Sequence, residues 1–201
     1  MIKRIEIDKE YADVLAELML GSDFDWYWNP ATIFEYKVGA VIDAKTKDTP
    51  QFTHTIFDDH STKSMYYHYF SEMVRHIEPY IGKVKKLIRI KANLIIGDAT
   101  YPKDFYNGPH ADYYGDNMLT FLYYVNDSDG DTILFDGELD GKEHNITELN
   151  EVHRETPKAG TGIVFNSQRI HTSTSPVLSE RRVVINYVLE MENDIKDTQL
   201  S

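Results

Sequence analysis

The second half of this sequence is a series of short apolar segments separated by turn residues, and this pattern restricts the fold more than any other feature. Alternation of apolar and polar residues begins at Leu87. Further strand-like segments follow at 117–126, 132–135, 163–165 and 182–188. Such segments between turns are typical of antiparallel sandwiches and barrels. Helical spacing precedes them at 7–20 and 61–80. We therefore predict a mainly β protein with N-terminal helices bracing one sheet.

The length of 201 residues suits a single domain with a sizeable core. Within it we expect helical and irregular support at about 1–86, a β core at about 87–190 and a polar tail at 191–201. The absence of cysteine excludes disulfides, thiolate catalysis and iron–sulfur clusters. The N-terminus lacks the apolar run of a signal peptide, and no segment approaches the ~18–20 apolar residues of a membrane span. We expect an intracellular, cytoplasmic protein.

The formal net charge of −12 disfavours nucleic acid as a partner, because binding to phosphates depends on lysine and arginine. One basic segment stands out, with Lys83, Lys85, Lys86, Arg89 and Lys91. We favour its interpretation as a solvated strand edge. The alternative is a site for an anionic partner or substrate.

His110 and Asp112 are separated by one residue, so on a strand their side chains point to the same side. His171 lies 59 residues beyond Asp112 and must arrive from another strand. Two histidines and one carboxylate on one face of a metal leave the opposite face open. Non-haem Fe(II) oxygenases use this facial arrangement. The pattern therefore predicts a metal site made by these three residues.

Arg182 follows His171 by eleven residues and opens the last strand-like segment. Its planar guanidinium can hold a carboxylate through two hydrogen bonds. Arg181 is adjacent and is the alternative anchor. Because side chains alternate along a strand, only one of the two can face the site, and we favour Arg182.

The order of these motifs resembles the Fe(II)/2-oxoglutarate-dependent oxygenases, within their prolyl-4-hydroxylase-like branch. The similarity covers about 87–188, and the N-terminal half also resembles phage-type proteins. The matching segments are Ala92-Asn93-Leu94, His110-Ala111-Asp112, 123–127 with Gly130-Asp131-Thr132, 160–165, and 171–177.

The resemblance implies a double-stranded β-helix, or jelly roll, with Fe(II) held by His110, Asp112 and His171. It implies 2-oxoglutarate as co-substrate, its far carboxylate held by Arg182 and Tyr124, and O2 as oxidant. Ascorbate is a candidate additional cofactor. The implied reaction hydroxylates a C–H bond of a small-molecule or peptide substrate and releases succinate and CO2.

Three departures from the family pattern affect this site. Asp131 stands where the family has a second glycine, and the spacing from His171 to Pro176 is one residue longer. Leu94 replaces a tyrosine, and we predict that Asn93 makes the hydrogen bond of that tyrosine.

Two other functions fit part of the pattern. A metal-dependent hydrolase with a Zn²⁺-bound water could use the same three ligands. It leaves Arg182 and Tyr124 unexplained and has no obvious general base. A non-catalytic jelly-roll binding module would place the histidines in its core. The loop 98–107 is a candidate for substrate contacts. For Trp26 and Trp28 we favour core packing, and contact with the substrate is the alternative.

Overall fold

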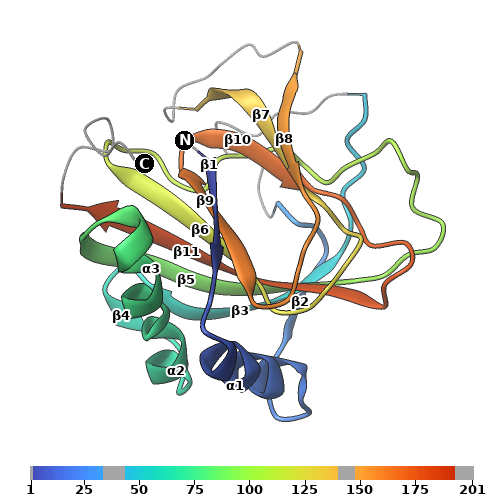
Figure 1. Ribbon diagram of the computed structural model, residues 1–201. Helices are drawn as coiled ribbons and strands as arrows, with labels where there is room; N and C mark the ends of the chain where they lie inside the picture. The colour runs from blue at the N-terminus through green and yellow to red at the C-terminus, as the bar shows by residue number, and fades with distance from the viewer. Residues whose placement is uncertain (1, 34–43, 140–147, 193–201) are drawn as a thin grey trace.

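The structure is a computed structural model that describes residues 2–33, 44–139 and 148–192. Its strands form two antiparallel sheets, and three helices cover one face of the larger sheet (Figure 1). The helices are α1 (Lys9–Leu20), α2 (Tyr67–Ser71) and α3 (Met73–Ile81). The strands are β1 (Ile2–Glu6), β2 (Tyr27–Asn29), β3 (Gln51–Asp58), β4 (Ser61–Thr62), β5 (Val84–Ile96), β6 (Met118–Tyr124), β7 (Thr132–Glu138), β8 (Glu151–Glu155), β9 (Thr161–Asn166), β10 (Arg169–Ser173) and β11 (Arg181–Met191). The predicted mainly β fold with helices bracing one sheet is confirmed.

The larger sheet has the strand order β1-β9-β6-β11-β5-β3-β2, with β4 pairing β3, and the smaller sheet has the order β10-β7-β8. The first 86 residues therefore supply four strands as well as the helices. The sequence pattern indicated only the helices clearly. The reason is visible in β3, where the polar residues Gln51 and His54 are buried on opposite faces, so that hydropathy marks neither face.

The helices and the larger sheet enclose the main hydrophobic core. Helix α1 begins after Asp8, whose carboxylate accepts a hydrogen bond from the backbone N–H of Tyr11. Its buried Leu15 and Met19 pack with Phe121 of β6. Each such side chain contributes about 1.5–3 kcal/mol when fully buried. This core holds the larger sheet from one side and leaves its other face for the smaller sheet.

Strand β6 is buried along its whole length because both of its faces are covered. Phe121 and Tyr123 face the helices, whereas Leu122 and Tyr124 pack between the sheets. A strand buried on both faces shows no polar alternation, which explains why its sequence reads as a continuous apolar run.

The inner face of the larger sheet carries a row of polar residues on β11 and β5. Val184 packs between the two sheets, so its neighbours two residues away share that face. The facing pairs in the register are Arg182 with Ile95, Val184 with Asn93, and Asn186 with Lys91. These residues form one wall of the space between the sheets.

Most predicted elements are present with shifted ends. The predicted helix at 61–80 is divided at Glu72 into α2 and α3, and α3 ends before Gly82, whose φ is +89°. Among the described residues no helix combines the length and apolar character needed to cross a membrane. The predicted polar tail lies outside the described residues beyond Glu192.

Candidate active site

A cavity of about 620 Å³ lies between the two sheets. The inner faces of β5 and β11, the strands β7 and β10, and residues 107–114 contribute its lining. All three predicted metal ligands line the cavity, together with Arg182 and Asn93. The structure therefore brings five of the six predicted site residues into one cavity and leaves out Tyr124.

His110 and His171 are held side by side by their own backbones. They form an isolated antiparallel bridge, and their ring centroids are 4.6 Å apart. The Nδ1 atoms lie 3.0 Å from the carbonyl oxygens of Gly108 and Arg169. When each Nδ1–H donates to that carbonyl, the Nε2 atom is free as a metal ligand. The local chain thus fixes both the position and the tautomer of the two imidazoles.

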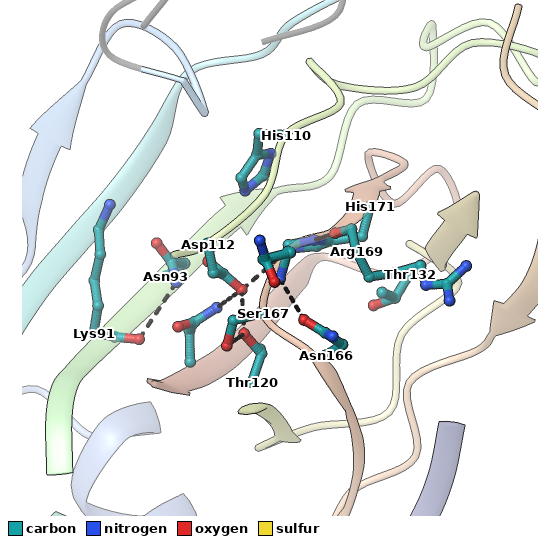
Figure 2. A network of polar contacts seen from close by, with 12 residues as sticks. Lys91, Asn93, His110, Asp112, Thr120, Thr132, Asn166, Ser167, Arg169 and His171 are labelled. Carbon is teal, nitrogen blue, oxygen red and sulfur yellow. Dashed lines mark hydrogen bonds and ion pairs between the residues drawn. The ribbon is translucent and has the colours of Figure 1, made fainter. Parts of the chain in front are cut away.

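Asp112 completes a donor set suited to one metal ion. One ligand atom from each of His110, Asp112 and His171 lies within 4.8 Å of the others, and His171 Nε2 is 3.3 Å from Asp112 Oδ2. Figure 2 shows the side chains of His110, Asp112 and His171 close together. Two imidazole nitrogens and one carboxylate oxygen are the donors that Fe(II) oxygenases present. The residues present therefore fit Fe(II).

Three side chains hold the carboxylate of Asp112 from behind. Arg89 Nη2 donates to Oδ1 at 2.8 Å, and Asn186 Nδ2 donates to Oδ2 at 2.9 Å. The hydroxyl of Thr120 lies 2.9 Å from Oδ2 and 3.0 Å from Ser167 Oγ (Figure 2). Outer contacts of this kind orient a metal ligand. Sequence reasoning missed these residues, because they come from three different strands or loops and form no local motif.

The electrostatics of the triad suit metal binding. Burial, reinforced by the nearby His171, lowers the pKa of His110 to about 4. Burial acts to raise the pKa of Asp112, but His171 and Arg89 outweigh it and hold that pKa well below its usual range. At neutral pH His110 is therefore neutral and Asp112 is ionised, which are the forms that bind a metal.

Arg182 is a buried cation, and only 4% of its surface is exposed. Nε donates to the Gly130 carbonyl at 2.8 Å and Nη2 to Thr132 Oγ1 at 2.8 Å. Among the described residues no carboxylate lies within salt-bridge distance of it, and burial lowers its pKa. Buried charges are normally paired. Arg181 pairs with the exposed Ile96 and does not line the cavity.

Tyr124 does not line the cavity. It is fully buried between the sheets, and its hydroxyl donates to Thr132 Oγ1 at 3.0 Å. The residue that stands between Tyr124 and the cavity is Thr132, which also contacts Arg182. Sequence reasoning did not select Thr132. Its position directly after the Gly130-Asp131 turn is the signal that could have indicated it.

Asn93 lines the cavity opposite Val184, and its amide lies 3.4 Å from the carbonyl oxygen of Lys91. This contact is long, so the amide is available for a ligand. Its predicted role as the replacement for a tyrosine stays a prediction.

The departure at Asp131 has a structural explanation. A Cβ atom at Gly130 would come within 2.9 Å of Arg182 Cδ and 3.0 Å of the Thr174 carbonyl oxygen, so this position requires glycine. The side chain of Asp131 instead turns away from the cavity and accepts hydrogen bonds from Arg154 and Thr156. A carboxylate is therefore tolerated there.

The structure also locates the two tryptophans and the side chains of the basic segment. Trp26 packs against the main core as we favoured, Trp28 is 61% exposed, and neither lines the cavity. In the basic segment, Lys83 and Lys85 are largely exposed and pair with glutamates. Arg89 and Lys91 are different because they line the cavity. The solvated-edge interpretation is therefore wrong for these two residues.

Residues 98–189, slightly less than half of the chain, match the family model of the 2OG-Fe(II) oxygenase superfamily. The matched region contains the three predicted metal ligands and Arg182. No curated protein matches the chain at a significant level.

Solved structures of similar fold include several non-haem enzymes. An oxidoreductase of the 2OG-Fe(II) oxygenase family from Burkholderia pseudomallei matches with a TM-score of 0.62 at 12% identity, covering 96% of this chain and 86% of that chain. The 2-oxoglutarate-dependent epimerase SnoN from nogalamycin biosynthesis matches with a TM-score of 0.61 at 11% identity, covering 99% and 83%. The carbocyclase SnoK from the same biosynthesis gives 0.54 at 11%, covering 94% and 79%. At these identities the likeness establishes the fold, which is the predicted jelly roll.

The family match, the jelly-roll fold and the triad support the 2OG-Fe(II) oxygenase superfamily. The residues that match the family model include the triad and Arg182, and the triad offers the donors that Fe(II) binds in such oxygenases.

Proposed function

We propose that this protein is an Fe(II)- and 2-oxoglutarate-dependent dioxygenase that hydroxylates a C–H bond of its substrate. The observation that carries the proposal is the pairing of two features in one cavity: a facial triad of metal ligands and a buried arginine without a carboxylate partner among the described residues. A diacid that chelates the metal at one end and reaches Arg182 at the other satisfies both.

His110 and His171 would bind Fe(II) through Nε2 and Asp112 through a carboxylate oxygen. When bound, Fe(II) supplies O2 activation coupled to oxidative decarboxylation of 2-oxoglutarate, with succinate and CO2 as products. The chain itself keeps the three ligands in place before the metal arrives. The backbone bridge fixes both imidazoles, and the contacts of Asn186 and Thr120 fix the carboxylate.

Arg182 would hold the far carboxylate of 2-oxoglutarate. The guanidinium is already desolvated, so a bound carboxylate gains a charge-assisted hydrogen bond without the cost of burying a new cation. Thr132 lies beside it and supplies a hydroxyl at the same end of the cavity. In this proposal Tyr124 acts through Thr132, by orienting that hydroxyl, and does not touch the co-substrate.

Hydroxylation as the outcome rests on the motifs shared with the prolyl-4-hydroxylase-like branch. Proteins of similar fold include an epimerase and a carbocyclase, so this fold also supports other outcomes in other proteins. In each case the protein's contribution is to position one C–H bond and to exclude water. The cavity volume of about 620 Å³ leaves room for a co-substrate and part of a second molecule.

A metal-dependent hydrolase is the second function that the ligands allow. It requires a general base near the metal-bound water. Among the described cavity residues Asp112 is the one carboxylate, and it is committed to the metal and to Arg89. Arg182, which has no carboxylate partner among the described residues, also has no role in hydrolysis. These two observations favour the oxygenase.

The test measures succinate formed from 2-oxoglutarate by protein loaded with Fe(II) under air. We expect turnover in the wild type, even without the second substrate, and none in Asp112→Ala. The same protein loaded with Zn²⁺ should not cleave ester or amide substrates. Succinate formation that persists in Asp112→Ala would show that the triad assignment is wrong.

A further inference from the structure

The charges that line the cavity do not balance. Among the described residues that line it, three are cationic, Arg89, Lys91 and Arg182, and one is acidic, Asp112. Bound Fe(II) and a 2-oxoglutarate dianion would cancel each other. Two positive charges then remain in a partly buried space, within a protein whose formal net charge is −12. Such an excess inside an acidic protein favours an additional anion.

Arg89 is a poor binding partner for this additional anion because its guanidinium already contacts other side chains of the site. Its Nη2 atom contacts both Asp112 and Asn186, and its Nε atom is buried without a hydrogen-bond partner. A ligand in the cavity therefore has little access to this guanidinium. Its main effect is to hold Asp112 and to add positive charge to the wall.

Lys91 is the cation that remains available. No hydrogen bond or ion pair between described residues uses its ammonium group, although the side chain lines the cavity and is only partly exposed. Burial and the nearby Arg89 lower its pKa, whereas Asp112 and the exposed Asp58 act in the other direction. A lysine that is kept partly desolvated without a partner costs free energy unless a ligand pairs with it.

Lys91 also lies away from the proposed co-substrate anchor. It faces Asn186 on β11, four residues along the strand from Arg182, which corresponds to about 13 Å at 3.3 Å per residue. Figure 2 shows Lys91 on one side of Asp112 and Thr132, the neighbour of Arg182, on the other. The metal triad therefore lies between two separate cationic positions.

We propose that the primary substrate carries an anionic group, a carboxylate or a phosphate, and that Lys91 binds this group and so selects and positions the substrate beside the metal. The inference rests on the proposed oxygenase function. Arg182 takes the co-substrate and Lys91 takes the substrate, so each cation has its own ligand.

The aromatic side chains at the cavity suggest a suitable probe. Tyr113 and Tyr114 line it and are 41% and 37% exposed. We therefore choose phenylacetate and phenyl phosphate as anionic probes, with phenylacetamide as the neutral match. Mn(II) replaces Fe(II) to prevent turnover, and saturating 2-oxoglutarate fills the Arg182 end. Binding is measured by the broadening of the ring proton signals of each probe by Mn(II).

With the wild type, the ring proton signals of one or both anions should broaden, and those of the amide should not. Lys91→Met should weaken anion binding by about 10- to 100-fold, as expected for loss of a charged hydrogen bond. Lys91→Arg should retain most of it. Lys85→Met is the matched control, because Lys85 lies on the same strand, pairs with Glu190 and is outside the cavity.

Equal binding of the amide, or anion binding that survives in Lys91→Met, would overturn the proposal. So would binding of none of the probes. If Lys91→Met instead weakens the binding of 2-oxoglutarate, Lys91 belongs to the co-substrate site and the proposal is wrong. Binding of Mn(II) and 2-oxoglutarate is measured before any probe is added, so failure of the oxygenase function is seen separately.

Discussion

His110 and His171 each donate a backbone N–H to the carbonyl oxygen of the other, at 2.9 Å in both directions, although 61 residues separate them in the sequence. This reciprocal pair sets the distance between the two imidazoles without help from a metal. The geometry of the site is therefore a property of the fold. It follows that outer contacts, as well as the ligands, should control metal affinity.

Thr120→Val should weaken Fe(II) or Mn(II) binding by about 10- to 100-fold, because it removes a hydrogen bond that orients the carboxylate of Asp112. Valine keeps the shape of threonine, so the fold should be retained. Thr161→Val is the control, since its hydroxyl contacts the Lys158 carbonyl away from the cavity. Titration calorimetry under anaerobic conditions gives both affinities. Equal affinities in the two variants would contradict the expectation.

Arg182→Met should strongly weaken 2-oxoglutarate binding and leave metal binding intact. Losing one partner of a buried charged pair costs about 2–5 kcal/mol, or roughly 30- to 5,000-fold in affinity. The ligand-free variant should be at least as stable as the wild type. The substitution removes a buried cation that has no carboxylate partner among the described residues. Arg181→Met is the control and should bind normally. A large loss of stability in Arg182→Met, measured by urea unfolding, would show that the arginine is structural.

Gly130→Ala should weaken 2-oxoglutarate binding, because its Cβ would collide with Arg182 Cδ and displace the guanidinium. We expect a loss of about tenfold or more, since displacement by a fraction of an ångström weakens a bidentate contact. Asp131→Asn changes the next residue, whose side chain points away, and should leave the affinity unchanged. A larger loss of 2-oxoglutarate affinity in Asp131→Asn than in Gly130→Ala would contradict the placement of this turn.

The metal-free protein should lose stability in mild acid. The pKa of His110 is about 4 in the fold and about 6.5 in the unfolded chain, so between these values only the unfolded chain takes up the proton. Neutral His110 therefore contributes at most about 3 kcal/mol to the free energy of unfolding. This contribution is present above pH 6.5 and is lost as the pH falls to 4. Part of the His110 side chain remains exposed, which reduces this figure. Urea unfolding of wild type and His110→Gln at pH 7, 5.5 and 4.5 should show a weaker pH dependence in the variant.

Residues that form a motif can be selected from the sequence, and the structure places four of them in one cavity. His110, Asp112, His171 and Arg182 were each recognisable from residue type, spacing and order. Tyr124 matches a tyrosine of the family motif, and its role at the co-substrate stays a prediction; in the structure it is fully buried between the sheets. Motif position alone does not reveal such burial.

The residues that support the site were not predictable in the same way. Arg89 and Lys91 belong to a basic segment in which lysines on both faces of β5 read alike. Only the pairing of β5 with β11 separates the cavity face from the solvent edge. Thr120 and Asn186 lie within apolar strands, and their contacts with Asp112 are fixed by strand register, which a single sequence does not define.

The central claim is that one metal ion is shared by His110, Asp112 and His171 and that 2-oxoglutarate bridges it to Arg182. Anaerobic calorimetry with Fe(II) followed by 2-oxoglutarate tests it most directly. We predict one Fe(II) per chain, 2-oxoglutarate binding only after the metal, loss of both in Asp112→Ala, and loss of 2-oxoglutarate alone in Arg182→Met. Tight 2-oxoglutarate binding without metal, or unchanged Fe(II) binding in Asp112→Ala, would contradict the account.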